Sequence, residues 1–386
     1  MRILVINAGS SSVKFSVFDM DSDNECFDSE TERAASVEEA LMQIPAALKK
    51  ARQHHFDAIG QRVGHGGEKF KDACVIDDTV VADIKACIPL APMHNPPALA
   101  GIAMARKTWN VPQVAVFDTA FHQTIESHAT TYAVPESWRK VGVRRYGFHG
   151  TSHCYIMQRV ADELKKPATD LRIISCHLGN GASVCAIERG QSVDTSMGMT
   201  PLAGLVMGTR SGDVDPGIFT YLKHTLGLTV EQIEAALYHD SGLAGLSGFG
   251  NDLRDIEKQA VTGNKNAQLA IKIYAYRIKK YIGAYTAAMG GLDVLSFTGG
   301  IGENSVSMRS HICTGLEFLG LHFDEARNAQ VKLKAFEASH LHKPHSQVKV
   351  LVTKTREQWM IAKDTHRLLG HITHSALVTR KKTASY

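Results

Sequence analysis

The chain lacks any long hydrophobic run. Its 386 residues are 44% hydrophobic, yet no apolar stretch approaches the about 20 residues that a membrane-spanning helix needs. The first such stretch, "ILVI" at residues 3–6, is four residues long, which is too short for the hydrophobic part of a secretory signal. These absences predict a soluble, cytoplasmic protein without a membrane partner.

Paired cysteines and a strong net charge are also missing. The seven cysteines are odd in number and scattered without a C-x-x-C pattern, which predicts reduced thiols rather than a disulfide framework. The net charge is only +4, and the basic end "TRKKTASY" is short, so we expect no nucleic-acid partner. The length exceeds the about 250–300 residues at which single cores stop growing, which predicts two domains.

The standard phosphate-binding signatures are absent. Neither G-x-x-x-x-G-K-[ST] nor G-x-G-x-x-G followed by an acidic residue occurs, which disfavours P-loop and Rossmann enzymes. What the chain has instead is three strand-to-turn units that end in "NAGSSS", "HLGNGAS" and "TGGIGENS". Glycines and serines in such turns let backbone N–H groups approach an anion closely. Any one of them is more simply a tight turn, but the three together indicate a bound nucleotide.

The order of elements indicates a duplicated α/β fold. "RILVINAGSSS" and "RIISCHLGNGAS" both place an apolar strand before a turn of small residues, and aligning them brings Gly9 onto Gly179. Segments with helical apolar spacing, such as "VEEALMQIPAALKKARQHH" and "NAQLAIKIYAYRIKKYIGAYTAAMGG", separate the strands. No flexible linker is visible, so we expect the chain to cross between domains near residues 146–153.

Several cations lie near these turns. Arginine suits carboxylates and phosphates because its planar fork can bind two oxygens at once, although a lone arginine near glycines is more often structural. Phosphoryl transfer needs such charge around the transferred group. The candidate cations are Lys14, Arg62 in "GQRVGHGG", Arg144, Arg145 and Arg210.

Two further candidates are ambiguous from spacing alone. Asp118 ends an apolar strand and could be a metal or base carboxylate, or only a turn cap. His149 and His153 stand four residues apart, but they lack the glutamate of H-E-x-x-H. Gly150 between them argues against a regular helix, so a zinc site is disfavoured.

A series of motifs resembles the acetokinase family, which comprises acetate kinases and their propionate- and butyrate-kinase relatives. The matches run in the family's order from residue 3 to about residue 364. The resemblance implies an acetate and sugar kinase/Hsp70/actin fold with two duplicated lobes and a central cleft. It also implies Mg²⁺ (or Mn²⁺), ATP/ADP and a small carboxylate as substrates, and a homodimer. The motifs are "INAGSSSVKF", "RVGHGGEKF", "APMHNPPAL", "FDTAFHQT", "YGFHGTSH", "HLGNGAS", "DTSMGMTPLAGLVMGTRSGDVDP" and "FTGGIGENS".

The resemblance also implies roles for individual residues. The catalytic set would be Asp118, His149 and Arg210, and the magnesium site would use Asn7 and Glu357. The acyl-substrate pocket would be lined by Arg62, Gly64, Met93, Phe148 and Pro201. The residues expected around ATP are Ser10, Ser12, Lys14, His177, Leu178, Gly179, Asn180, Gly181, Asp252, Leu253, Arg254, Gly300, Ile301, Gly302, Glu303 and Asn304.

The expected lobes are residues 1–148 with 358–386 on the acyl-substrate side, and residues 149–357 on the nucleotide side. Three positions depart from the family pattern. Gly64 replaces an apolar side chain, Met93 replaces a leucine, and "KTREQ" at residues 354–358 replaces "PTNEE". In the last change Glu357 keeps the position of the family's magnesium glutamate while its neighbours differ. Gly64 predicts a larger pocket for the alkyl tail of the acid.

The expected reaction is reversible transfer of the ATP γ-phosphoryl group to acetate by direct in-line displacement. A carboxylic acid has a pKa of about 4 and is already ionised near neutral pH, so Asp118 is expected to organise a metal or nearby cations rather than abstract a proton. One alternative is a propionate or broad short-chain acyl kinase, because one methylene in an apolar pocket changes preference about 10- to 200-fold. An alternative of another class is an actin-like or Hsp70-like ATPase.

Overall fold

The computed structural model describes residues 1–9, 13–22, 24–31 and 36–383. Ser10 and Ser12 therefore lie outside the described residues. None of the helices in the described part combines the length and the apolar character of a membrane span. The chain divides into two compact units. The first unit consists of Met1–Gln123, Gly150–Ser152 and Arg356–Tyr386, and the second consists of Thr124–His149 and His153–Thr355.

Each unit is built on one six-stranded sheet, and the two sheets have the same topology. Their orders are β3-β2-β1-β4-β6-β5 and β11-β12-β10-β7-β8-β9. Each sheet begins with an antiparallel three-stranded meander. Two parallel strands then extend the sheet, and a short antiparallel strand closes its edge. This repetition confirms the predicted duplicated α/β fold.

The strand bounds show where the repeat detected in the sequence comes from. β1 ends directly before Gly9 and β7 ends directly before Gly179, so the two glycines are equivalent in the duplicated sheets. The strands of the first unit are β1 (Arg2–Ala8), β2 (Val13–Asp19), β3 (Asn24–Glu30), β4 (Ala58–Val63), β5 (Cys74–Val75) and β6 (Gln113–Phe117). Those of the second are β7 (Arg172–Leu178), β8 (Ala182–Glu188), β9 (Gln191–Thr195), β10 (Val294–Thr298), β11 (Ala338–His340) and β12 (Lys349–Thr353).

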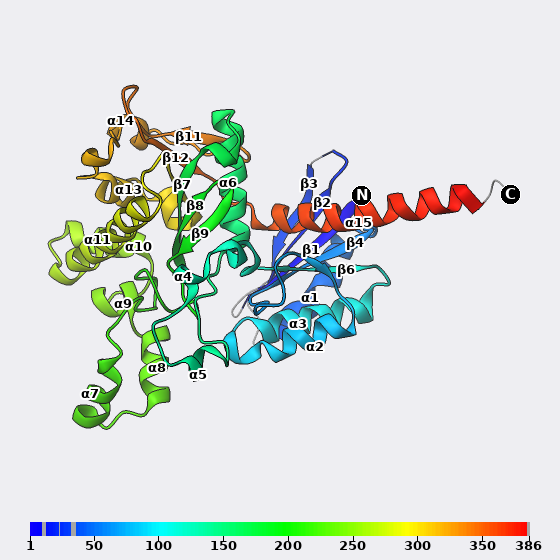
Figure 1. Cartoon of the computed structure of the whole chain (residues 1–386), viewed down its shortest axis with the longest axis horizontal. Helices are drawn as coiled ribbons and strands as arrows, with labels where there is room; N and C mark the ends of the chain where they lie inside the picture. The colour runs from blue at the N-terminus through cyan, green and yellow to red at the C-terminus, as the bar shows by residue number, and fades with distance from the viewer. Residues whose placement is uncertain (10–12, 23, 32–35, 384–386) are drawn as a thin grey trace. The chain divides into compact units, whose positions relative to one another are not determined.

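Helices cover both faces of the first sheet (Figure 1). Successive side chains of a strand point to opposite faces, so Leu4 and Ile6 pack with the helices α1 and α3. Ile3 and Val5 pack with α15 on the other face. The bounds are α1 (Val37–Lys50), α2 (Asp78–Ala86), η1 (Ile88–Leu90), α3 (Asn95–Thr108), η2 (Ala120–Thr124) and α15 (Glu357–Thr383).

The second sheet packs against the long helix α11 (Lys265–Ala288), which contacts β7 and β8. Its buried face includes Tyr274, Ile278 and Ile282, which join the largest apolar core of the chain's described part. The remaining helices are α4 (Ser127–Thr130), α5 (Glu136–Arg139), α6 (Gly150–Leu164), η3 (Ala168–Asp170), α7 (Gly217–Leu226), α8 (Val230–His239), α9 (Gly242–Ser247), α10 (Leu253–Val261), α12 (Gly299–Asn304), α13 (Val306–Cys313), η4 (Glu317–Leu319) and α14 (Glu325–Ala329).

Parallel strands bring the candidate site residues to one edge of each sheet. β1, β4 and β6 are parallel neighbours, so their C-terminal ends lie together and carry Asn7, Arg62 and Asp118. In the second unit β7 and β10 are parallel neighbours, with His177 paired to Thr298. In open α/β sheets this is the edge at which ligands bind.

Candidate functional site

A partly buried ion pair joins the ends of β4 and β6. Nε and Nη2 of Arg62 both donate to Oδ2 of Asp118, at 3.0 and 2.5 Å, and Nη1 donates to Oδ1 of Asn7 at 3.3 Å. Burial by itself would lower the pKa of Arg62, but the charges of Asp118 and Glu357 outweigh it and raise that pKa. The structure therefore brings three predicted site residues together around one permanent cation.

The segment that follows Arg62 is pinned by buried polar side chains. Oδ1 of Asn95 accepts from the backbone N–H of His65 at 3.0 Å, and Nδ2 of Asn95 donates to the carbonyl of His65 at 3.0 Å. The Thr119 hydroxyl accepts from the N–H of Gly66 at 3.1 Å. Burial lowers the pKa of His65 to about 4, so its imidazole is neutral near neutral pH. Arg62 thus stands at the start of a fixed turn.

Gly64 does not leave an open space. A Cβ on Gly64 would lie 2.5 Å from Cβ of His94 and 3.4 Å from Oδ1 of Asn95. The room that a side chain at position 64 would need is therefore occupied by His94. The expectation that Gly64 enlarges the alkyl pocket is corrected accordingly: this glycine permits the close approach of the segment that contains His94. Met93, beside it, is 48% exposed.

The remaining candidates of the first unit are Lys14 and Glu357. Lys14 pairs in register with Asn7 across β1 and β2, and its ammonium lies 4.0 Å from Glu30. Glu357 is the first residue of α15. Within the described residues no group of three or more His, Cys, Asp or Glu side chains could hold a metal ion. Asn7 and Glu357 offer oxygen atoms, the type of ligand that Mg²⁺ takes while it keeps most of its water.

A cavity of about 460 Å³ in the second unit is lined by half of the residues expected around ATP. Its walls come from the turns after β7 and β10 and from the start of α10. The expected residues that line it are Gly179, Asn180, Asp252, Leu253, Arg254, Gly300, Ile301 and Asn304. Nδ2 of Asn304 donates to the carbonyl of Gly300 at 2.9 Å, and the hydrogen bond from Arg254 lowers the pKa of Asp252 to about 2. The cavity is polar at these points and has the size of a nucleotide-binding pocket.

Sequence reasoning missed three residues of this wall, Asn251, Glu257 and Ser305. Nδ2 of Asn251 donates to Oδ1 of Asn180 at 2.8 Å, and the Ser305 hydroxyl donates to Glu257 at 2.8 Å. Glu257 stands one turn after Leu253 on α10, so helical spacing from the predicted Leu253 could have found it.

Four other expected residues lie beside this cavity rather than in its lining. Glu303 accepts from the N–H groups of Gly299 and Thr355, at 3.1 and 2.8 Å, and holds the glycine turn after β10. Leu178 and Gly302 are buried. The ring of His177 lies 4.4 Å from that of His149.

His149 and Arg210 converge on Gly181. A Cβ on Gly181 would lie 3.4 Å from Nε2 of His149 and 3.7 Å from Nη1 of Arg210. His149 holds a φ of 59°, a conformation that costs energy for a residue other than glycine and that is common at functional sites. The imidazole of His149 and the guanidinium of Arg210 thus both lie next to Gly181, in the turn that follows β7.

Gly150 does not interrupt the helix, contrary to the sequence-based expectation. It is the first residue of α6, directly after His149. A Cβ on Gly150 would lie 2.3 Å from the carbonyl oxygen of Asp118, and the N–H of Gly150 donates to that oxygen at 2.8 Å. Glycine serves here for a close backbone contact, which spacing alone does not reveal.

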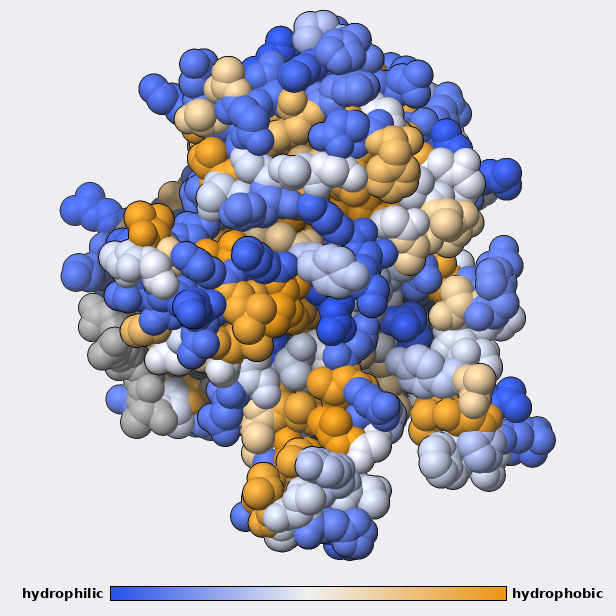
Figure 2. Space-filling model, turned by 90° about the vertical axis from the view of Figure 1, so that its left-hand side faces the viewer, coloured by the Kyte–Doolittle hydropathy of each residue, from blue (hydrophilic) through white to orange (hydrophobic). Residues whose placement is uncertain are grey.

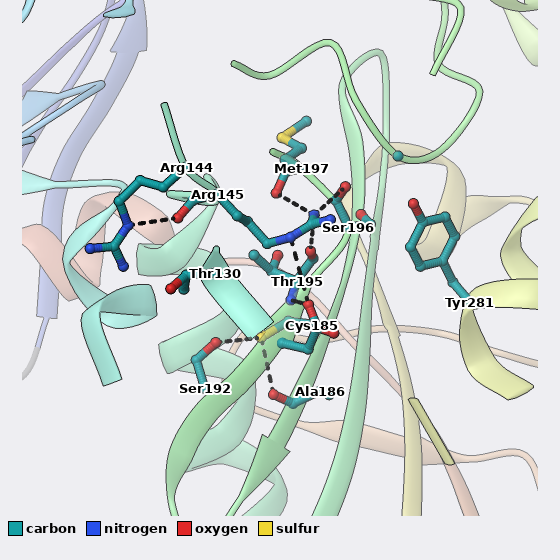
Figure 3. A network of polar contacts seen from close by, with 12 residues as sticks. Thr130, Arg144, Arg145, Cys185, Ala186, Ser192, Thr195, Ser196, Met197 and Tyr281 are labelled. Carbon is teal, nitrogen blue, oxygen red and sulfur yellow. Dashed lines mark hydrogen bonds and ion pairs between the residues drawn. The ribbon is translucent and has the colours of Figure 1, made fainter. Parts of the chain in front are cut away.

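A half-buried arginine holds the segment that leads to Pro201. Figure 3 shows Nη1 of Arg145 directed at three successive carbonyls, those of Thr195, Ser196 and Met197, at 2.7, 3.1 and 3.0 Å. Further along, the carbonyl of Pro201 accepts from Nη1 of Arg210 at 3.2 Å. Arg145 therefore has a structural role, because it binds three backbone carbonyls of this segment.

The two other candidates near this segment take different positions. The Phe148 side chain is buried in the core of the second unit. Nε of Arg144 donates to the carbonyl of Arg145 at 3.4 Å, and its guanidinium lies 5.6 Å from the centre of the Tyr146 ring.

Comparison with known proteins decides the family. The sequence model of the acetokinase family matches residues 24–363. The chain belongs to the acetokinase family. It is 46% identical over 401 residues to a protein named acetate kinase from Thermoanaerobacter pseudethanolicus. That alignment covers 96% of this chain and 99% of the other protein. It is 44% identical to the acetate kinase of Bacillus subtilis, in an alignment that covers 95% of this chain and 99% of that protein.

Solved structures of this family match nearly the whole chain as well. The crystal structure of Porphyromonas gingivalis acetate kinase matches with a TM-score of 0.89 and 43% identity, over 95% of this chain and 99% of that one. A propionate kinase from Francisella tularensis matches with a TM-score of 0.88 and 38% identity, over 94% of this chain and 98% of that one. The acetokinase fold thus accommodates enzymes named for two different acids.

The contact at Gly64 gives a testable consequence for stability. Gly64→Ala places a methyl group against His94, and such overpacking lowers the free energy of unfolding by about 1–3 kcal/mol. The matched control is Gly283→Ala in α11, where a Cβ would meet nothing within 4 Å; it should raise that free energy by up to about 1 kcal/mol. Urea denaturation measures both values. A Gly64→Ala protein as stable as the wild type would show that the space is open after all.

Proposed function

We propose that the chain is an acetate kinase, which transfers the γ-phosphoryl group of ATP reversibly to acetate and gives acetyl phosphate and ADP. The observation that carries this proposal is the 46% identity, over nearly the whole length of both chains, to a protein that bears this name. The described parts of both units support it. The first unit has a fixed cation for the acid, and the second has a cavity of suitable size for ATP.

On the acid side, Arg62 is the cation that binds the carboxylate. Two anions, the acid and ATP, repel each other unless positive charge lies between them. The bonds from Asp118 and Asn7 hold the guanidinium in one orientation, which reduces the reorganisation needed during the reaction. Asp118 acts by holding Arg62, since a carboxylic acid is already ionised near neutral pH and needs no base.

On the nucleotide side, the cavity lined by Gly179, Asn180 and Asp252 holds ATP. Arg210 and His149 donate hydrogen bonds to the phosphoryl oxygens, whose charge spreads in a loose transition state. A carboxylate oxygen of acetate forms a bond to the γ-phosphorus while the bond from that phosphorus to the β,γ-bridging oxygen breaks. The electron pair of the broken bond leaves on ADP, and no proton moves.

A divalent cation fits the oxygen donors of the first unit. Asn7 and Glu357 would hold Mg²⁺, or Mn²⁺ in its place, through an amide oxygen and a carboxylate. The ion would neutralise charge on the β- and γ-phosphate oxygens. The charge of Glu357 raises the pKa of Arg62, so this carboxylate acts on the same cation as Asp118.

Acetate is the preferred acid in this proposal. The sequence-based reason to favour propionate was a gap beside Gly64, and His94 fills that space. The likeness to a propionate kinase structure keeps a broad short-chain acyl kinase as the second candidate. An actin-like or Hsp70-like ATPase would need neither a buried carboxylate-binding arginine nor any acid substrate. We also propose a cytoplasmic location, since ATP is available there.

A series of straight-chain acids tests the reaction and the preference together. The purified chain with Mg²⁺, ATP and hydroxylamine should give acyl hydroxamate from acetate. We expect kcat/KM for propionate to be about ten-fold lower and that for butyrate lower still, because each extra methylene must displace packed side chains. The control without any acid should give no hydroxamate. ATP hydrolysis without hydroxamate would contradict the proposed function, and equal values for the three acids would contradict only the preference.

We further propose that the protein is a homodimer. Figure 2 shows hydrophobic patches among hydrophilic side chains on the face that carries α7 and α11. Tyr221 and Leu226 of α7 and Leu269 and Tyr276 of α11 are exposed, and exposed apolar area of this kind marks interaction surfaces. Sedimentation equilibrium should give twice the mass of the chain, and the mass of one chain would contradict the proposal.

A further inference from the structure

A continuous line of hydrogen bonds leads from His149 into the core of the second unit. Nδ1 of His149 lies 2.9 Å from the hydroxyl of Ser183, and the same hydroxyl lies 2.8 Å from Nε2 of His153. Nδ1 of His153 lies 2.9 Å from the hydroxyl of Ser175. His153, Ser175 and Ser183 are fully buried. We call these four side chains the histidine–serine chain.

The fold explains why these side chains meet. His149 precedes α6 and His153 is on its first turn, and both rings lie within hydrogen-bond distance of the Ser183 hydroxyl. Ser175 and Ser183 come from the antiparallel strands β7 and β8, where Ser183 pairs directly with His177. The four positions therefore depend on the packing of one helix against one hairpin, and no sequence motif joins them.

Two arrangements of the hydrogens make the histidine–serine chain continuous from end to end. A hydroxyl has one hydrogen, and a neutral imidazole has one N–H. In the first direction Ser175 donates to His153, His153 donates to Ser183, and Ser183 donates to Nδ1 of His149, which leaves the hydrogen of His149 on Nε2. In the second direction every bond is reversed, and Nε2 of His149 is left bare.

The surroundings of Nε2 favour the first direction. This nitrogen and the guanidinium of Arg210 border the same point above Gly181, and the titratable ring of His177 lies against the His149 ring. Arg210 is a permanent cation, so it opposes a second charge on His149. A bare Nε2 would in addition turn a lone pair toward a phosphoryl anion bound there. A neutral ring with its hydrogen on Nε2 avoids both costs.

We propose that His153 is a positioning residue which, through Ser183, holds His149 neutral with its hydrogen on Nε2, directed as a donor at the phosphoryl group. This inference rests on the proposed function for the identity of that anion. The role of His153 is thus to select a tautomer. The two histidines four residues apart, which looked like a possible metal site in the sequence, act in series instead of sharing a metal.

Nitrogen-15 NMR of the histidine-labelled full chain reads the tautomer directly. With Mg²⁺ and a non-hydrolysable ATP analogue bound, we expect His149 to show a protonated Nε2 and a bare Nδ1. His149→Gln assigns its signals. A protonated Nδ1 with a bare Nε2, or a doubly protonated ring, would overturn the proposal. This measurement requires no turnover, so it decides the tautomer even if acetate is not phosphorylated.

The variant Ser183→Ala tests the connection between the two histidines. We expect kcat to fall about ten-fold, the effect of one lost hydrogen bond, with KM for ATP changed less than about two-fold, and the His149 ring to show both tautomers. The matched control is Ser192→Ala, which removes another fully buried hydroxyl of this sheet, one that contacts Cys185 at 3.3 Å. It should leave kcat and the His149 spectrum unchanged.

A second variant guards against misfolding. Ser183→Cys keeps the volume and a weak donor, so its kcat should lie between those of Ser183→Ala and the wild type. An unchanged kcat and an unchanged His149 spectrum in a folded Ser183→Ala or Ser183→Cys protein would overturn the role of the histidine–serine chain. Absence of acyl hydroxamate in the wild type would instead contradict the proposed function.

Discussion

The ion pair between Arg62 and Asp118 is the constraint on which the first unit's site depends. A largely buried guanidinium is costly unless its charge is balanced. Here the Asp118 carboxylate balances the charge and the Asn7 amide accepts a further hydrogen bond, at the ends of three parallel strands. That placement puts a fixed cation at the edge where open α/β sheets bind ligands. Asn95 and Thr119 then fix the turn that follows.

The second unit repeats the topology with different chemistry. The turn after β7 is equivalent to the turn after β1, yet it carries Gly179, which lines the cavity, and Gly181, which lies next to nitrogen atoms of His149 and Arg210. His149 is held there against the backbone preference of its residue type, and the histidine–serine chain supplies bonds that compensate for this strain. Duplication thus provided two equivalent edges, and local side chains made one cationic and placed a cavity at the other.

Much of this was predictable from the sequence, because the duplicated strands and their glycine turns lie in continuous segments. The alignment of Gly9 with Gly179 marked equivalent strand ends, and the motif series identified most of the cavity wall. What was missed depends on contacts between distant segments. The sequence "RVGHGG" does not show that His94 fills the space beside Gly64. Gly150 was expected to break a helix, whereas it allows a close backbone contact with Asp118. The bonds through Ser175 and Ser183 likewise require the folded sheet.

A double-mutant cycle on kcat/KM for acetate tests the central claim, that Asp118 acts by holding Arg62. Arg62→Ala and Asp118→Ala should each lower this value strongly. If the two side chains act as one unit, the double variant loses little more than the worse single variant, and the coupling is about ten-fold or larger. Losses that multiply in the double variant would show that Asp118 acts independently of Arg62 and would contradict the account.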